Sequence, residues 1–259
     1  IWDNGSNKAD TQAISDFLEA ATTTTAGSVK TIPLRQVIDL GNGAKATAVA
    51  VGGSIVGATT TLSVTEENDQ SVALLIQYGL FDYMMSGDLG GGDDDTACTG
   101  RTSGQKNIET TLINALMPGG GAGLLTVSGV EAMMVPHHGS ETSMNSDFMN
   151  RLSPRVAIIS VGEGQGLAFQ HPRKDIVEKV LMAEATSCIT AKPAMVLQTD
   201  EGGPIGTDTS NKGFVAGDIV IKTNGVTAFQ VSGSGRVREG SPDERVDSRT
   251  DTPLTLPMD

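Results

Sequence analysis

Two apolar stretches that follow each other place the strongest constraint on the fold of this chain. Residues 71–78 and 80–85 are nearly uninterrupted in apolar side chains, and only Gly79 separates them. Strands of this kind are typical of a sheet interior that is covered on both faces. The second stretch ends in Ser86-Gly87-Asp88. We therefore predict two neighbouring strands inside a layered α/β protein, with a carboxylate just after the second strand.

Further elements follow from apolar spacing and from turn residues. We expect helices over residues 8–22, 107–117, 146–152 and 174–183. We expect strands over residues 31–40, 45–51, 59–64, 127–135, 156–161, 188–198, 218–223 and 226–231. Asn42-Gly43 and Asn224-Gly225 predict hairpin turns. Strands that alternate with helices, with hairpins at both ends, predict an α/β fold with mixed sheets over residues 1–231, followed by a polar, loosely attached tail over residues 232–259.

All three histidines of the chain follow apolar stretches. His137 and His138 are adjacent after residues 133–135, and His171 stands before Pro172. Imidazole and carboxylate groups are frequent metal ligands, so these histidines and Asp88 form a candidate metal site. Neighbouring residues at a strand end point in opposite directions, so one histidine reaches a given metal more easily, and we favour His138. The alternative is structural: a buried core histidine beside an exposed one, and a carboxylate that caps a turn.

The charge of the chain argues against one class of function. The net charge is −13, from 31 acidic and 18 basic residues. Proteins bind long nucleic acids through Lys and Arg contacts to phosphates, which this balance disfavours. No apolar run approaches the roughly 18 residues of a membrane span. The low aromatic content of 3% and the 32 glycines are typical of an exported or a salt-adapted protein, and we expect an extracellular or periplasmic location.

The two cysteines, Cys98 and Cys188, allow two interpretations. They form one disulfide of an exported protein, or they are two unrelated thiols. The sequence alone does not decide between these interpretations. The residues around Cys98 do not have the spacing of zinc ligands.

Six stretches carry a resemblance to a known family. They are residues 68–75, 85–89, 135–140, 152–162, 171–172 and 199–202. The most specific feature is a His-His-Gly-Ser motif with a Gly-Asp upstream and a His-Pro downstream. In this order and spacing the chain resembles the metallo-β-lactamase fold, and more closely the hydrolase domain of the ComEC competence proteins and their exported stand-alone relatives.

The resemblance implies a four-layer αββα sandwich that binds metal between its two sheets. It implies up to two zinc ions, with manganese as the alternative metal. Asp88 is then the carboxylate that bridges two metals, and one of His137 and His138 is a ligand. His171 is either a ligand or the donor of a proton to the leaving group. Ser140 and Ser143 support the loop that carries the histidines.

One part of the family pattern is missing. The family's first ligand cluster is a His-x-His-x-Asp-His motif, and no histidine precedes His137 in this chain. The resemblance places that motif on hairpins N-terminal to Ile1. A sandwich without these hairpins exposes apolar faces and sheet edges. We therefore expect the missing N-terminal segment or a second copy of the chain to cover them.

Together these patterns predict a metal-dependent hydrolase, completed by that N-terminal segment. A metal-activated water attacks a phosphodiester or another small ester. The family suggests nucleic acid as a substrate, whereas the charge of −13 disfavours it. The alternative function is a metal-poor, non-catalytic binding or structural remnant of the same fold.

Overall fold

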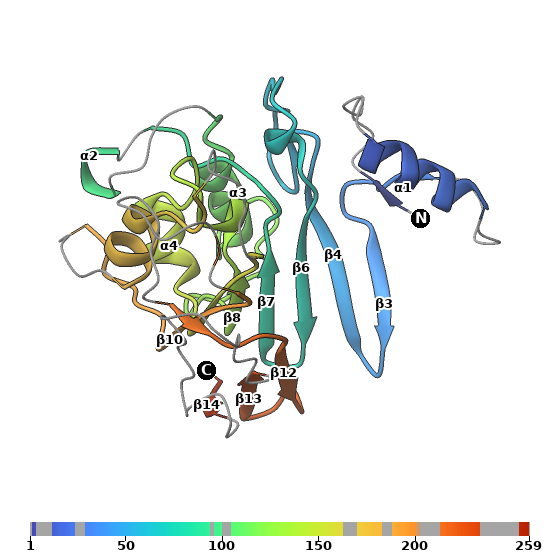
Figure 1. Ribbon diagram of the computed structural model, residues 1–259. Helices are drawn as coiled ribbons and strands as arrows, with labels where there is room; N and C mark the ends of the chain where they lie inside the picture. Colours follow the sequence, from blue (N-terminus) through green and yellow to red (C-terminus); the bar gives the residue numbers. More distant parts are fainter. Residues whose placement is uncertain are drawn as a thin grey trace.

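A mixed β-sheet of nine strands forms the centre of the molecule (Figure 1). The computed structural model describes residues 2–3, 12–23, 29–93, 96–99, 105–162, 170–182, 188–200, 202, 213–233 and 254–258. The strand order of the sheet is β11-β10-β9-β8-β7-β6-β4-β3, and β5 pairs with β4. Its strands are β3 (Val37–Gly41), β4 (Ala44–Val51), β5 (Ser54–Ile55), β6 (Ala73–Tyr78), β7 (Phe81–Met85), β8 (Ala132–Met134), β9 (Val156–Ile159), β10 (Met195–Gln198) and β11 (Phe214–Val215).

The sheet has an antiparallel half and a parallel half that meet at β7. Strands β3, β4, β6 and β7 pair antiparallel, whereas β7 through β11 pair parallel. The predicted adjacent strands β6 and β7 are confirmed, and they form a hairpin in which Leu74 is opposite Met85. The chain is therefore a mixed α/β protein, as the sequence predicts.

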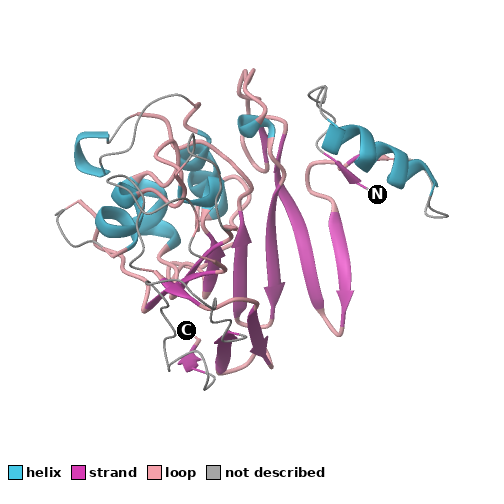
Figure 2. Cartoon of the chain, in the orientation of Figure 1, coloured by secondary structure: helices cyan, strands magenta, loops and turns pink. Residues whose placement is uncertain are grey.

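Helices cover one face of the sheet (Figure 2). They are α3 (Ile108–Leu116), α4 (Ser146–Leu152) and the π-helix η3 (Asp175–Leu181). Their inward side chains, including Leu112, Phe148 and Val177, join the largest buried apolar cluster. Asparagine side chains begin two of them: Asn107 accepts a hydrogen bond from Thr110 N at 3.1 Å, and Asn145 accepts one from Phe148 N at 2.8 Å. Such caps satisfy backbone donors that a helix leaves free at its start.

A three-stranded antiparallel sheet packs on part of the opposite face. It consists of β12 (Ile219–Thr223), β13 (Ala228–Gly233) and β14 (Leu254–Pro257) in that order. Phe229 and Val231 pack against Ala132, Val156 and Met195 of the large sheet in a second buried cluster. The predicted hairpin around residues 224–225 is thus confirmed.

The remaining described elements lie at the margins of these layers. They are α1 (Gln12–Thr23), the parallel pair β1 (Trp2–Asp3) and β2 (Lys30–Thr31), α2 (Thr96–Thr99), and the single turns η1 (Asn68–Gln70) and η2 (Pro136–Gly139). None of the helices in the described ranges is long and apolar enough to cross a membrane.

Some predicted elements are wrong or too long. Residues 59–64 form no strand, because Leu62 and Val64 pack on the main core from a loop, in which Leu62 N donates to Gly53 O at 2.9 Å. The strands predicted over residues 127–135 and 188–198 were too long, because only β8 and β10 within them are strands. Residues 254–257 were expected in a loosely attached tail, but they form β14 and pair with β13. Residues 234–253 of that tail lie outside the described residues.

A disulfide joins Cys98 to Cys188, with 6.2 Å between their Cα atoms. It links α2 to the segment after η3, which are 90 residues apart in the sequence. Of the two interpretations left open by the sequence, the structure has the disulfide.

Candidate functional site

The candidate residues meet where two neighbouring parallel strands end. Met85 of β7 is paired with Met134 of β8, so both strands finish at the same edge of the sheet. Asp88 follows β7 by three residues, and His137 and His138 follow β8 by three and four residues. Ligand sites of α/β proteins commonly form at this edge, because the loops after parallel strands converge there.

The histidines do not continue the strand, which corrects the prediction that they point in opposite directions from a strand end. Both lie in the turn η2 with left-handed backbone conformations, φ 49° at His137 and φ 53° at His138. A non-glycine residue in this conformation costs about 1–3 kcal/mol, so surrounding contacts must hold it. His137 N donates to Gly87 O at 3.0 Å, which ties the turn to the end of β7.

Two serines, Ser140 and Ser143, form hydrogen bonds within the histidine turn. Both are buried, and Ser143 Oγ lies 3.0 Å from Pro136 O and 3.0 Å from Ser140 O. Ser140 N donates to His137 O at 2.8 Å. Ser140 Oγ lies 3.2 Å from Thr142 Oγ1, whose hydroxyl in turn contacts the ring of His137.

Both ring nitrogens of His137 have hydrogen-bond partners. Its Nε2 lies 3.2 Å from Asn68 Nδ2, and its Nδ1 lies 3.0 Å from Thr142 Oγ1 and 3.2 Å from Gln105 Oε1. Because an amide nitrogen only donates, Nε2 accepts and Nδ1 carries the proton. Burial lowers the pKa of His137, while Asp88 opposes this shift. A neutral imidazole with hydrogen-bond partners at both nitrogens has a structural role, because it fixes the turn against the neighbouring segments.

His138 has one anchored nitrogen and one exposed nitrogen. Its Nδ1 lies 2.6 Å from Ser160 O. A carbonyl oxygen only accepts, so Nδ1 is the donor, and in the neutral ring Nε2 keeps its lone pair. That Nε2 lies 3.8 Å from Asp88 Oδ1, and the side chains of His138 and Asp88 are 46% and 35% exposed.

The end of β7 holds Asp88 in place through its backbone. Asp88 N donates to Ser71 Oγ at 3.0 Å, and Gly87 has φ 57°. A Cβ atom on Gly87 would lie 2.8 Å from the Cβ of Ser71, so the close approach of these segments requires glycine here. The carboxylate thereby faces His138 from the adjacent strand end.

His171 completes the group of three imidazoles. Its ring is 5.5 Å from the ring of His137 in an edge contact and 6.3 Å from that of His138 in a stacked arrangement. The residue is only 7% exposed. Burial lowers the pKa of His171 to about 4, and the neighbouring His137, His138 and Arg173 add to the shift. His171 is therefore neutral at pH 7.

A buried glutamate that the sequence analysis does not single out supports the loop after the histidines. Glu109 of α3 is fully buried, and its carboxylate accepts from Met144 N and Asn145 N at 2.7 Å each. Asn145 Nδ2 donates to Gly91 O at 3.2 Å, which connects this loop to the segment after Asp88. The spacing of Glu109 with Leu112, Ile113 and Leu116, on one helical face, is the signal that could have revealed a buried carboxylate.

A second buried carboxylate lies beside the residues that contact His137. Asp69 is 1% exposed, and burial raises its pKa. Its Oδ2 accepts from Lys106 N at 3.0 Å, which fixes the segment that carries Gln105. No described residue bonds to the other oxygen, Oδ1. Asp69 and its neighbour Asn68 thus hold the surroundings of His137.

The described residues contain no group of three or more His, Cys, Asp and Glu side chains that is arranged to hold a metal ion. They do bring Asp88, His137, His138 and His171 into one cluster. Asp93 is exposed in the loop after Asp88, and the aspartates at positions 94 and 95 lie outside the described residues.

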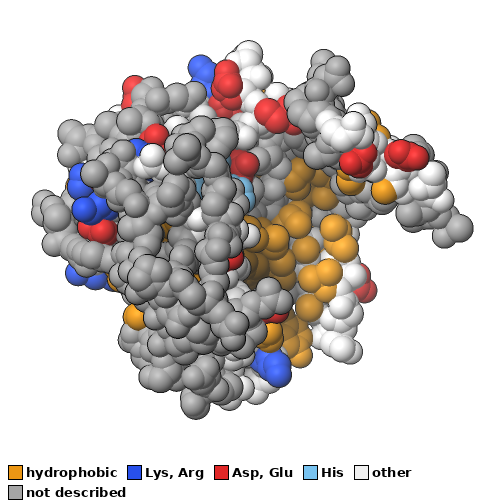
Figure 3. All heavy atoms as spheres, in the orientation of Figure 1, with side chains coloured by type: hydrophobic (Ala, Val, Ile, Leu, Met, Phe, Trp, Pro, Cys, Tyr) orange, Lys and Arg blue, Asp and Glu red, His pale blue; other side chains and the backbone are white. Residues whose placement is uncertain are grey.

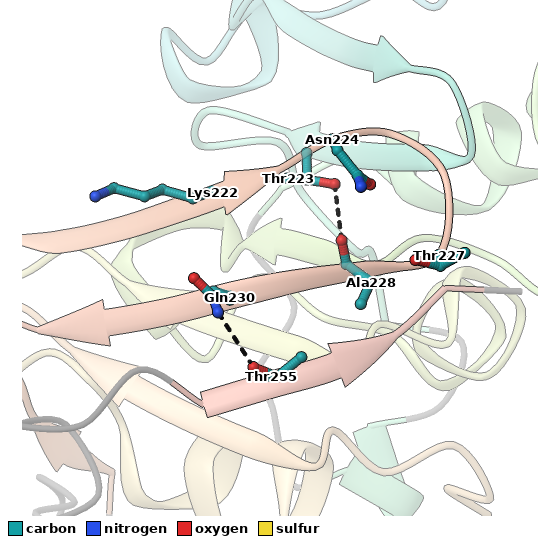
Figure 4. Close-up of a pocket in the computed structure, with 7 residues that line it drawn as sticks. All are labelled: Lys222, Thr223, Asn224, Thr227, Ala228, Gln230 and Thr255. Carbon is teal, nitrogen blue, oxygen red and sulfur yellow. Dashed lines mark hydrogen bonds between the residues drawn. The ribbon is translucent and has the colours of Figure 1, made fainter.

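Two hollows lie away from this cluster, both at the three-stranded sheet. One, of about 360 Å³, is a depression at β12 and β13, lined among others by Lys222, Asn224 and Gln230 (Figure 4). The other, of about 280 Å³, lies between the two sheets and is mainly apolar.

A comparison of the chain with protein-family models and with curated proteins found no match.

Proposed function

We propose that the chain is the part of a metal-dependent hydrolase that supplies Asp88 and His138 as ligands of a divalent metal, zinc or manganese. The observation that carries this proposal is the 3.8 Å approach of His138 Nε2 to Asp88 Oδ1, with His138 Nδ1 bonded to a carbonyl oxygen. Because Nδ1 donates to the carbonyl, Nε2 is the nitrogen of His138 that faces the carboxylate. A divalent cation between these two atoms would be bound by both of them.

The arrangement of His138 Nε2 and Asp88 Oδ1 fits two ligands of one metal better than it fits an isolated ion pair. Zinc–nitrogen and zinc–oxygen bonds are about 2.0–2.2 Å long, and two of them end to end exceed the 3.8 Å between the two atoms. One ion can therefore touch both. Metal-binding histidines typically donate their other ring N–H to a carbonyl or carboxylate, as His138 does to Ser160 O.

In this proposal the three histidines have different tasks. His138 is the ligand, and His137 positions the turn because both of its ring nitrogens are engaged. His171 lies at the edge of the cluster as a neutral imidazole that is able to donate a hydrogen bond to a leaving oxygen. A metal held by Asp88 and His138 would supply a bound water of lowered pKa as the nucleophile. Ser140 and Ser143 keep the turn in shape.

We further propose a four-layer αββα sandwich for the complete protein. The helix layer, the nine-stranded sheet and the partial second sheet are compatible with three of its layers. A phosphodiester or another small ester is the substrate class, since the charge of −13 disfavours long nucleic acids. An extracellular or periplasmic location is consistent with the disulfide.

A hydrolysis assay tests the enzymatic part of the proposal. Bis(p-nitrophenyl) phosphate and p-nitrophenyl acetate are incubated with the protein plus Zn²⁺ or Mn²⁺. The proposal is supported if the wild type releases nitrophenol, if Asp88→Asn does not, and if the control Asp147→Asn, at an exposed position, still does.

The second candidate function is a metal-poor binding or structural remnant of the same fold. It is favoured by one observation: the described residues offer two facing ligands, whereas a catalytic zinc takes about three from protein. Bound metal without any turnover of either ester, in protein that includes all segments of the natural chain, would select this alternative.

A further inference from the structure

Two adjacent histidines lie close to the carboxylate of Asp88. His138 Nε2 lies 3.8 Å from Asp88 Oδ1. The charge of Asp88 also acts on the ring of His137, where it opposes the lowering of the pKa by burial. Figure 3 shows histidine side chains, in pale blue, at the surface near the middle of the view, close to an acidic side chain. Proximity to the carboxylate alone therefore does not explain why His138 is the proposed ligand.

A side chain of the turn η1 occupies the nitrogen of His137 that a metal would need. Asn68 Nδ2 lies 3.2 Å from His137 Nε2, which accepts its hydrogen bond. A neutral imidazole has one nitrogen that accepts, so this bond uses the lone pair that a metal would bind. The other nitrogen, Nδ1, carries the proton and lies 3.0 Å from Thr142 Oγ1. His137 therefore offers no nitrogen lone pair to a metal as long as Asn68 keeps this bond.

The neighbour of Asn68 fixes the opposite side of the same ring. Asp69 is buried, and its Oδ2 accepts from Lys106 N at 3.0 Å. That bond holds the segment in which Gln105 Oε1 lies 3.2 Å from His137 Nδ1. Two consecutive residues of η1 thus hold the His137 ring at both of its nitrogens, one directly and the other through residue 105.

The turn η1 is itself anchored to the sheet and to Asp88. Gln70 O accepts from Gly52 N, just after the end of β4, at 3.3 Å. Ser71, which follows the turn, accepts from Asp88 N at 3.0 Å. The contact with the His137 ring and the contact with Asp88 therefore come from one short segment, which sets the position of that ring relative to the carboxylate.

The hydrogen bond from Asn68 distinguishes the two rings from each other. His138 donates from Nδ1 to a backbone carbonyl, and its Nε2 faces the carboxylate. Metal-binding histidines typically have this arrangement, with one anchored and one open nitrogen. Without the Asn68 side chain, His137 would keep its donation from Nδ1 to Thr142, and its Nε2 would be open in the same way.

We propose that Asn68 determines which of the two adjacent histidines binds the metal, because it occupies Nε2 of His137 and leaves Nε2 of His138 as the ligand. This inference rests on the proposed function and adds to it a residue that selects the ligand. Asn68 acts through His137 and touches no metal itself, so it is a positioning residue. We expect its removal to give the metal a second nitrogen ligand at His137.

NMR spectra of the three histidine rings test the proposal in the wild type. Long-range proton–nitrogen spectra of the isotope-labelled full chain show each ring nitrogen as protonated, as accepting or, after addition of Zn²⁺, as metal-bound. We expect the Nδ1–H form of His137 without metal, and a Zn²⁺-dependent shift of Nε2 in His138 but not in His137. In Asn68→Ala, Nε2 of His137 should shift as well. A purely structural role of Asn68 would leave that nitrogen unaffected by the metal in both proteins.

Isothermal titration of paired variants with Zn²⁺ gives a second test. His138→Ala should lose binding, and the Asn68→Ala, His138→Ala double variant should regain it, with an association constant at least ~10-fold above that of His138→Ala. The matched control is Asn224→Ala combined with His138→Ala, which should not regain binding. Asn224 is an exposed amide beside Gly225, whose carbonyl contacts the turn at the opposite end of β7 from Asp88. Urea unfolding shows whether each variant stays folded, and the spectra decide the outcome if the double variant unfolds.

The outcomes separate this inference from the proposed function. A wild type in which Zn²⁺ shifts no histidine nitrogen overturns the proposed function and this inference with it. A Zn²⁺-dependent shift of His137 Nε2 in the wild type overturns this inference alone. The same holds for a folded Asn68→Ala, His138→Ala double variant that does not bind Zn²⁺ although the wild type does.

Discussion

Removal of the disulfide gives a stability change that can be worked out from the structure. Cys98 and Cys188 are 90 residues apart, and they are joined in the folded protein. In the chain-entropy description, a cross-link over a loop of that length stabilises the fold by about 4.6 kcal/mol at 25 °C. Measured losses on removing native disulfides are typically about 2–5 kcal/mol, so we expect the Cys98→Ser, Cys188→Ser double variant to lose an amount in that range.

Urea unfolding of the wild type and of the double variant measures this loss. At about 2 °C per kcal/mol for a chain of this size, the melting temperature should fall by about 4–10 °C. Wild type treated with dithiothreitol should match the untreated double variant, and the double variant itself should not respond to the reagent. Two reactive thiols in the unreduced, denatured wild type, or equal stabilities of the two proteins, would refute the reasoning.

Three further predictions concern buried polar groups. Glu109→Ala leaves the amides of Met144 and Asn145 without acceptors, so urea unfolding should show a loss of about 2–5 kcal/mol, against less than about 0.5 for exposed Glu66→Ala. Asn145→Ala removes the cap of α4 and its bond to Gly91 O, with an expected loss of about 1–3 kcal/mol in the same assay; a value near zero contradicts these contacts. Burial raises the pKa of Glu131 above its ordinary 4.5, so the folded state keeps the proton to higher pH than the unfolded state. This contribution to stability therefore falls as pH rises above about 4.5. The free energy of unfolding of Glu131→Gln, relative to that of the wild type, should increase from pH 4 to pH 7. Unfolding free energies of the two proteins that change with pH in parallel would exclude the effect.

Uninterrupted apolar stretches made part of the fold predictable from the sequence. β6 and β7 follow from residues that are apolar at successive positions, because both strands lie inside the sheet with a paired strand on either side. The loop over residues 59–64 is rich in β-branched threonine, yet Leu62 and Val64 pack on the core without a neighbouring strand to pair with. Apolar pattern alone does not separate a strand from a loop that packs inward, because only pairing distinguishes them.

The sequence pointed to the residue types of the candidate site, but the local geometry that it predicted for the two histidines was wrong. The apolar residues before His137 and His138 suggest a strand that continues, whereas both residues are left-handed in a turn. Contacts distant in sequence determine that conformation, such as His137 N with Gly87 O. Among the partners of the His137 ring, Thr142 is five residues away, whereas those at residues 68 and 105 come from separate segments that no local spacing connects.

Metal binding by the purified protein tests the central claim most directly. Isothermal titration with Zn²⁺ and with Mn²⁺ should show saturable binding to the wild type. That binding should be lost in Asp88→Ala and in His138→Ala, whose side chains face each other across 3.8 Å, and it should persist in the exposed control Asp147→Ala. A wild type that binds neither metal, or Asp88→Ala and His138→Ala variants that bind as the wild type does, would contradict the assignment of these two residues as metal ligands.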